Sequence, residues 1–204
     1  MKITYLHQYF NTPEMSGGTR SFEMGRRLVA MGHEVDMITA WRDGGRGDQW
    51  LETEESGMRV HWLPVDYSNH MSYRSRIRAF VRFALRAARK AASIDSDLVF
   101  ATSTPLTIAL PGVFASRRRG VPFVFEVRDL WPELPIAMGA LKNPLTRRTA
   151  VALERFAYRN ARSVVALSPG MRDGVTSTGI PAERVEVIPN SSDLEQFYPD
   201  LEAR

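Results

Sequence analysis

Short apolar runs recur along the chain and alternate with longer segments in which apolar residues repeat every three to four positions. Runs rich in Val, Ile and Phe are typical of strands buried in a parallel sheet. We expect strands over residues 2–7, 35–39, 58–64, 97–101, 123–127, 163–167 and 184–188. Because helical segments separate them, the pattern predicts a doubly wound, Rossmann-like α/β fold, with a mainly parallel sheet and helices on both faces.

Helical periodicity and punctuation by Gly and Pro delimit the helices between these strands. We expect helices from Gly17-Gly18 to about Met31, over 73–93, from Pro105 to about Arg119, over 144–161, and from Ser168 to Thr178. Residues 42–57 are rich in Gly, Asp, Glu and Arg and show no periodicity. They are therefore expected to form an exposed loop.

The predicted helix 73–93 is strongly basic. Its apolar positions follow helical spacing: Ile77, Phe80, Val81, Ala84, Leu85 and Ala88. Its remaining surface carries Arg74, Arg78, Arg82, Arg86, Arg89 and Lys90. We favour a helix that covers the sheet and exposes an arginine-rich face; the alternative is a helix that lies on an anionic membrane surface.

Composition narrows the class of protein. The chain has 204 residues, 44% of them hydrophobic, which suits one large domain or a tight pair. It contains no cysteine, so disulfides and thiolate metal sites are excluded and a reducing cytoplasm is expected. No apolar window is long enough to span a membrane. The net charge of +4 favours anionic partners only weakly.

The stretch Phe123–Glu133 combines a predicted strand with charged residues directly after it. Arg128 and Asp129 stand where that strand ends, and ligands of open α/β sheets bind beyond the carboxyl ends of the strands. These two residues are thus candidates for chemistry. The alternative is that Asp129 caps a helix.

The Gly17-Gly18 pair lies between a strand and a helix, where backbone N–H groups can bind a phosphate. The alternative is a plain helix start, since neither the dinucleotide nor the P-loop fingerprint is present. The four histidines have no metal-ligand spacing, and no serine lies in a G-x-S-x-G elbow. Metal sites and hydrolase triads therefore lack support.

Hydroxyl, amide and charged residues follow several of the predicted strands. In a parallel sheet such residues face one crevice, which favours a polar ligand. These candidates are Ser103, Thr104, Arg128, Asp129, Ser168 and Asn190.

Three motifs in this order resemble the N-terminal half of a retaining glycosyltransferase of family 4, which has the two-domain GT-B architecture. They are S-G-G-T-R at 16–20, V-R-D-L-W-P-E at 127–133, and V-I-P-N-S-S-D at 187–193 followed by Phe197 and Pro199. The spelling of the second motif is similar to that of fucosamine transferases and other enzymes that build bacterial surface polysaccharides. The resemblance covers nearly the whole chain.

The resemblance implies that Gly17 and Gly18 contact the donor diphosphate and that Asp129 and Arg128 are the catalytic pair. Asp129 would orient the acceptor or act as a base, and Arg128 would clamp an anion or a hydroxyl. Acceptor-binding candidates are Ser103, Thr104, Trp131, Glu133, Ser168 and Asn190.

Two positions depart from the family's pattern. Arg128 stands where many members have histidine, so a neutral imidazole role does not transfer, because arginine stays protonated. Ser191-Ser192 replaces the usual Gly-Val, and the geometry of that turn is left open.

The resemblance also implies a function for the whole protein. We expect residues 1–193 to form the acceptor-side domain, 194–204 to begin a linker, and the C-terminal donor-binding domain to be absent, which would leave the chain inactive alone. The complete enzyme would transfer a sugar from a nucleotide-sugar, without metal or cofactor, to a lipid-linked or oligosaccharide precursor of a polysaccharide.

Other partners and functions follow as expectations. The enzyme is expected in the cytoplasm, and nucleic acid is not expected as a partner. If the acceptor is lipid-linked, residues 73–93 would contact the inner face of the cytoplasmic membrane. Alternatives are a sugar-nucleotide epimerase of the same architecture and a non-catalytic ligand-binding domain.

Overall fold

The computed structural model describes residues 1–42, 49–65, 73–132 and 143–191. The strands are β1 Lys2–Leu6, β2 Glu34–Trp41, β3 Leu51–Glu55, β4 Met58–Pro64, β5 Leu98–Thr102, β6 Phe123–Val127, β7 Ser163–Ala166 and β8 Val185–Val187. The helices are α1 Arg20–Ala30, α2 Tyr73–Ser93, α3 Ala109–Arg119, α5 Pro144–Asn160 and α6 Pro169–Ser177. Short 3₁₀ turns cover Leu106–Ile108 and Ala182–Arg184.

These strands form one sheet in the order β3-β4-β2-β1-β5-β6-β7-β8. All neighbouring pairs are parallel except β3 with β4. The strand order reverses direction at β1, which pairs with β2 on one side and β5 on the other. The doubly wound α/β prediction is confirmed, and the crevice expected for such a sheet lies beyond the ends of β1 and β5.

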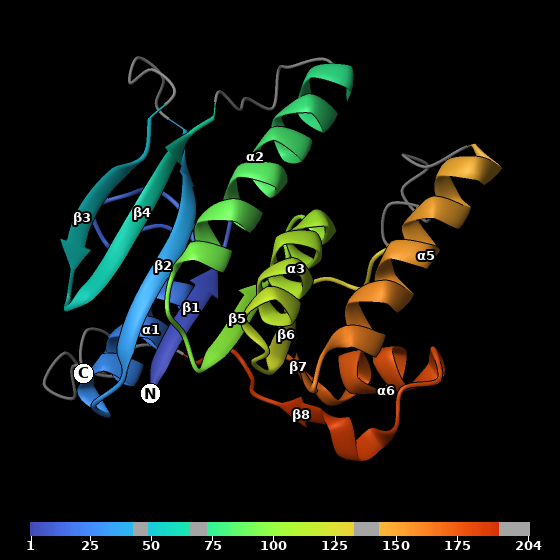
Figure 1. Ribbon diagram of the computed structural model, residues 1–204. Helices are drawn as coiled ribbons and strands as arrows, with labels where there is room; N and C mark the ends of the chain where they lie inside the picture. Colours follow the sequence, from blue (N-terminus) through green and yellow to red (C-terminus); the bar gives the residue numbers. More distant parts are fainter. Residues whose placement is uncertain (43–48, 66–72, 133–142, 192–204) are drawn as a thin grey trace, which may run out of the picture.

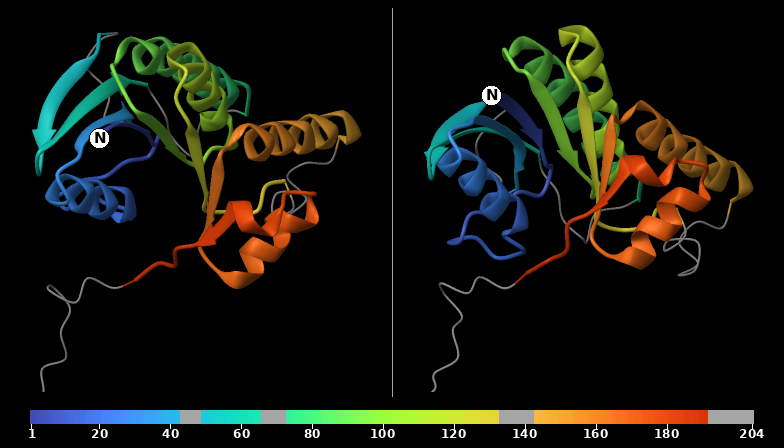
Figure 2. Two further views of the ribbon diagram at one scale, coloured as in Figure 1. Left: turned by 60° about the horizontal axis from the view of Figure 1, so that its bottom comes forward. Right: turned by 90° about the horizontal axis from the view of Figure 1, so that it is seen from below.

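Helices cover both faces of the sheet. Helix α1 lies on one face, while α2, α3 and α5 lie side by side on the other (Figures 1 and 2). The hydrophobic core is divided into two clusters, one on each face of the sheet, because successive side chains of a strand point to opposite faces. Tyr5 packs in the cluster beneath α1, and its neighbour Leu6 packs in the larger cluster on the opposite face.

Strand β3 corrects the prediction of a loop over the whole of 42–57. The segment Leu51–Glu55 pairs antiparallel with β4 at the edge of the sheet. The Thr53 hydroxyl accepts a hydrogen bond from the indole of Trp62 at 2.8 Å, and Glu52 binds Lys90 at 2.8 Å. Charged side chains suit an edge strand, so this sequence carries no apolar signal.

The buried face of α2 also differs from the predicted one. Residues that face the sheet are small or aromatic: Ala79, Phe83, Ala84, Ala87 and Ala91. Ile77, Val81 and Leu85 are instead 43%, 49% and 58% exposed. Alanines permit close packing against the sheet and α3, so the larger aliphatic side chains remain outside.

Candidate functional site

The polar residues after β1, β5, β6 and β8 meet at the carboxyl edge of the sheet. There they enclose a cavity of about 310 Å³. Its lining consists of His7, Tyr9, Asn11, Gly18, Thr104, Arg128, Asp129, Leu167 and Asn190. The predicted residues Gly18, Thr104, Arg128, Asp129 and Asn190 are thus brought together, at the reversal of strand order where ligands of such sheets bind.

Hydroxyl groups after β5 fix the charged pair after β6. The Thr104 hydroxyl donates to Asp129 Oδ2 at 2.8 Å, so this carboxylate is held at the cavity wall. The Arg128 backbone N–H donates to the Ser103 hydroxyl at 3.0 Å. Ser103 itself is only 2% exposed and does not line the cavity. It therefore supports the loop that carries Arg128 from behind.

The glycine pair lies just before α1, which begins at Arg20. Gly17 has a φ of +136°, a conformation that side chains disfavour, and a Cβ there would lie 2.4 Å from Asn11 Nδ2. The Asn11 amide donates to Gly18 O at 3.3 Å and accepts from Arg42. A Cβ on Gly18 would lie 3.7 Å from Arg128 Nη2, so the glycine backbone and a cation face each other.

A buried ion pair lies beneath this loop. Glu126 in β6 is fully buried, and its Oε1 accepts from Arg20 Nε at 2.8 Å. Its Oε2 accepts from the Thr102 hydroxyl at 2.8 Å, which lies 3.0 Å from the Tyr5 hydroxyl. Burial, together with the charge of Glu126, raises the pKa of Tyr5. Tyr5 therefore keeps its proton and can donate it to Thr102.

His7 contributes a neutral imidazole to the cavity. Its Nδ1 lies 2.8 Å from the Ser21 hydroxyl, and the residue is 2% exposed. Burial lowers the pKa of His7 to about 3, and the charges of Arg128 and Arg42 act in the same direction. The ring is therefore uncharged at neutral pH, and it can donate or accept a hydrogen bond but cannot form an ion pair.

Four predicted site residues, Gly17 among them, do not line the cavity, and one cannot be placed. Ser168 caps α6, since its hydroxyl accepts from the Met171 N–H at 3.2 Å. Trp131 is half-buried and packs against the larger core cluster, while Ser103 lies behind the cavity. Glu133 falls outside the described residues.

Sequence reasoning missed the cavity residues that follow β1. His7, Tyr9 and Asn11 come directly after that strand, and Leu167 follows β7. The available signal was position alone, because every parallel strand end contributes to the same edge. The sequence tests His7 only as a metal ligand, and its spacing does not support that role. Within the described residues, no group of three or more His, Asp or Glu could hold a metal ion.

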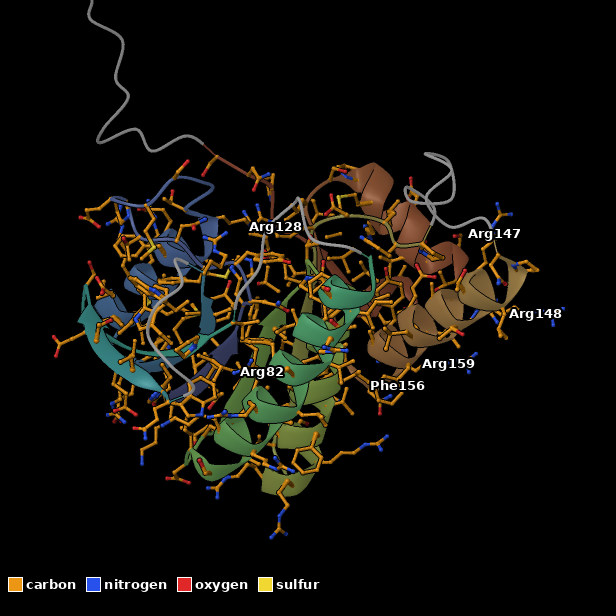
Figure 3. All side chains as sticks on the ribbon, turned by 90° about the horizontal axis from the view of Figure 1, so that it is seen from above. Arg82, Arg128, Arg147, Arg148, Phe156 and Arg159 are labelled. Carbon is orange, nitrogen blue, oxygen red and sulfur yellow. The ribbon has the colours of Figure 1, made fainter. Side chains whose placement is uncertain are left out.

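The arrangement suits a hydroxylated, anionic ligand. Arg128 supplies a permanent positive charge beside the backbone of Gly18, which precedes a helix N-terminus. Asp129 can accept a hydrogen bond from a ligand hydroxyl, and His7 and Asn190 can orient neutral polar groups. In Figure 3, Arg128 lies near the middle of the molecule, far from the arginines labelled on α5.

Comparison with known proteins decides the family. The family model described as "Glycosyl transferase 4-like domain" matches residues 17–191 of this chain. The matched region includes the glycine pair, Arg128, Asp129 and Asn190. The chain belongs to this family. A relative in Escherichia coli (strain K12), assigned as the colanic acid biosynthesis glycosyl transferase WcaI, is 26% identical over 91% of the chain and 49% of its own length. The chain therefore spans about half the length of this curated relative.

Two solved structures share the fold of this chain. Sucrose-phosphate synthase from Thermosynechococcus elongatus superposes with a TM-score of 0.67 at 17% identity, over 100% of this chain and 51% of that one. Anabaena Alr3699/HepE in complex with UDP-glucose gives a TM-score of 0.56 at 20% identity, over 96% and 45%. These likenesses show that the chain has the Rossmann-like fold of about half of each of these proteins.

Proposed function

We propose that this chain is the acceptor-side domain of a glycosyltransferase that moves a sugar from a nucleotide-sugar to a polysaccharide precursor, with retention of anomeric configuration. One observation carries the proposal: in a member of this family, Gly18, Arg128, Asp129 and Asn190 line one cavity at the carboxyl edge of the sheet. The colanic acid assignment of the relative, which aligns with 91% of this chain at 26% identity, supports a polysaccharide product.

Each residue receives a role from its chemistry. Asp129 accepts a hydrogen bond from the acceptor hydroxyl and orients it, and Thr104 fixes the carboxylate for that task. Arg128 clamps an anionic or hydroxyl oxygen. Backbone N–H groups at Gly17 and Gly18 stabilise the negative charge that grows on the leaving diphosphate. No metal or cofactor is required, since Arg128 and the loop supply the positive potential.

Transfer by a longer protein, in which this chain precedes a donor-binding half, tests the proposal. We expect Asp129→Asn to lower kcat about 10²- to 10⁴-fold with little change in thermal stability, because only the acceptor-orienting charge is lost. Ser168→Ala, at the cap of α6, is the matched control and is expected to retain activity. NMR of the product determines its anomeric configuration.

Two outcomes would contradict this function. Turnover of the nucleotide-sugar without any acceptor would identify an epimerase instead. Full transfer activity by the 204-residue chain alone would overturn the expectation that a second half is needed.

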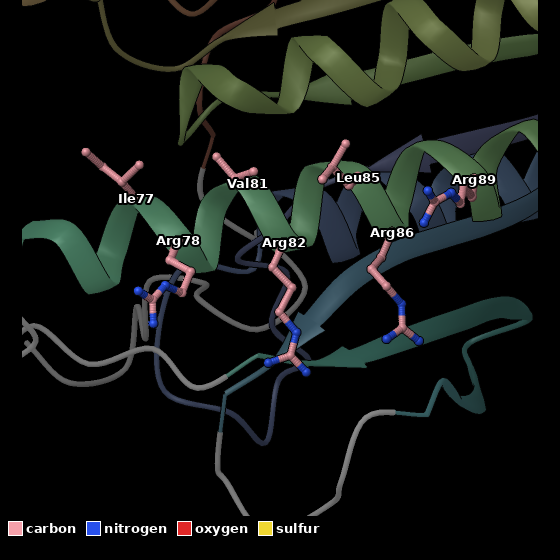
Figure 4. Close-up of a pocket in the computed structure, with 7 residues that line it drawn as sticks. All are labelled: Ile77, Arg78, Val81, Arg82, Leu85, Arg86 and Arg89. Carbon is pink, nitrogen blue, oxygen red and sulfur yellow. The ribbon is translucent and has the colours of Figure 1, made fainter.

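A lipid-linked acceptor is the finer proposal, and the exterior of α2 supports it. In Figure 4, Ile77, Val81 and Leu85 project on one side of α2, and Arg78, Arg82 and Arg86 on the other. An exposed aliphatic stripe flanked by arginines fits the boundary between headgroups and acyl chains. On the basis of this stripe and its arginines, we propose peripheral contact with the cytoplasmic membrane face through α2. None of the described helices is long and apolar enough to cross a bilayer.

A further inference from the structure

Arg20, the first residue of α1, joins two parts of the chain that are far apart in sequence. Its Nε donates to Glu126 Oε1 at 2.8 Å, and its Nη2 also lies 2.8 Å from this oxygen. The same guanidinium donates to three consecutive residues after β8. Nη2 bonds Ile188 O at 2.9 Å, and Nη1 bonds Pro189 O at 2.9 Å and Asn190 Oδ1 at 3.2 Å.

The exit segment, residues 188–190, has few other attachments. It follows the three-residue strand β8, and all three of its residues are exposed, Ile188 to 46%. The Ile188 N–H bonds Ala166 O at 2.9 Å and so continues the pairing with β7. Apolar burial therefore contributes little to the position of this segment, and the guanidinium is its main polar contact with α1.

Glu126 fixes the guanidinium in turn. This carboxylate is fully buried, and its second oxygen already accepts from Thr102. A buried carboxylate without its counter-ion is strongly unfavourable, so Arg20 is held in place by the charge of Glu126. The side chain of Arg20 is itself only 13% exposed.

We infer that Arg20 is a positioning residue: it anchors the exit segment to the start of α1, so that Asn190 and Gly18 face the same cavity. The site would then depend on a residue that does not line it, since Arg20 holds the Asn190 amide from behind. The inference rests on the proposed function only in assuming that a polar, anionic ligand enters this cavity.

Arginine is required here for a geometric reason. Its planar fork directs several donors at once, whereas the lysine ammonium is compact and ends a flexible stem. Arg20→Lys therefore keeps a positive charge for Glu126 but cannot reach Glu126 and all three exit residues together. This variant separates anchoring from charge compensation.

Amide hydrogen exchange on the 204-residue chain tests the anchor. We expect Arg20→Lys to accelerate exchange of the Ile188 N–H at least about tenfold, because charge-assisted hydrogen bonds from the guanidinium are lost. Exchange in β1, β5 and β6 should stay as in the wild type. Arg26→Lys is the matched control: Arg26 lies on the same helix but pairs with Glu23 at 2.7 Å.

A second readout reports on the cavity rather than on stability. Inorganic pyrophosphate is added, and NMR follows the backbone N–H of Gly18 and the side-chain amide of Asn190. In the wild type both signals should shift together. In Arg20→Lys the Gly18 signal should still shift while the Asn190 signal does not. If pyrophosphate shifts neither signal in any variant, the phosphate role in the proposed function is wrong, while the exchange result still decides the anchor.

If Arg20→Lys does not fold, two other measurements test whether Arg20 anchors the exit segment. The double variant Arg20→Met/Glu126→Gln leaves no buried charge unpaired and should show the same fast exchange at Ile188. In the wild type, the Arg20 Nε–H should exchange with water slowly enough to give a resolved NMR signal at neutral pH. Wild-type exchange at Ile188 in the substituted chains, or no protected Arg20 signal, would overturn the inference.

Discussion

Each glycine before α1 is required for a different reason. Gly17 is required by its backbone, because its φ of +136° strains any other residue. Gly18 does not have a positive φ, and a methyl group there would meet Arg128 Nη2 only at an ordinary distance of 3.7 Å. At Gly18, the absence of a side chain therefore matters for access to the cavity rather than for folding.

Alanine substitutions distinguish these reasons. We expect Gly17→Ala to destabilise the protein by about 1–3 kcal/mol, because it adds backbone strain and contacts Asn11. Gly18→Ala should change stability by less than about 0.5 kcal/mol yet weaken pyrophosphate binding about tenfold, as the methyl hinders a backbone hydrogen bond to the anion. Denaturant melts and NMR titration measure the two effects. Equal stability losses in both variants would contradict this assignment.

Helix α2 shows how packing decides which apolar residues are buried. Its alanines and Phe83 face the sheet, whereas Ile77, Val81 and Leu85 remain exposed beside a row of arginines. Periodicity correctly predicts the helix but not which apolar side chains it buries, because the close approach to the sheet and α3 favours small residues. This exposed aliphatic stripe is the basis for the proposed membrane contact of α2.

Vesicle binding tests that proposal on the 204-residue chain. We expect binding to vesicles that contain phosphatidylglycerol and much weaker binding to neutral phosphatidylcholine. The double variant Arg78→Gln/Arg89→Gln on α2 should weaken binding about thirtyfold, at about 1 kcal/mol per lost cation. Arg27→Gln/Arg59→Gln removes the same charge from α1 and β4 and is the control.

Equal losses in the two double variants would mean that net charge alone drives vesicle binding, against a defined surface on α2. Strong, salt-sensitive binding to mixed-sequence DNA would instead favour a nucleic-acid partner.

At the scale of the whole molecule, positive charge is concentrated on one face. Helices α2, α3 and α5 contain 14 of the 27 Lys and Arg residues and one of the 23 Asp and Glu residues. Figure 3 shows Arg147, Arg148 and Arg159 pointing outward from α5. The modest net charge of +4 therefore conceals a strongly polarised molecule.

Burial of the His7 ring makes the free energy of unfolding of the protein depend on pH in acid. The pKa of His7 is about 3 in the folded protein and about 6.5 when unfolded, so between these pH values the unfolded state binds more protons. We expect the contribution of His7 to the free energy of unfolding to fall by about 1.4 kcal/mol per pH unit from pH 6 to pH 4. Above pH 7 it should be constant.

The measurement compares wild type with His7→Gln in denaturant melts across this pH range. The variant should lose that part of the acid slope, and His33→Gln is the control for removing a half-buried histidine. Parallel slopes in wild type and His7→Gln would contradict the burial argument.

Much of the fold could be predicted from the sequence because it rests on local pattern. Apolar runs predict the parallel strands, and Pro144 marks the predicted start of α5, which the Asn143 side chain caps in the structure. Edge strand β3 has no apolar run, so pattern could not reveal it. For the site, strand ends predicted Thr104, Arg128 and Asp129. The Arg20–Glu126 pair depends on contacts 106 positions apart, which no local pattern encodes.

The position of α2 relative to the cavity determines how far the cavity would lie from a membrane that α2 contacts. The helix-covered face and the carboxyl edge of the sheet are adjacent sides of the molecule (Figures 1 and 2). If that face rests on a bilayer, the cavity lies above the membrane surface by about one helix diameter, roughly 10 Å. Under the proposed function, the sugar of a lipid-linked acceptor would have to stand about this far above the bilayer to reach the cavity while its lipid stays inserted.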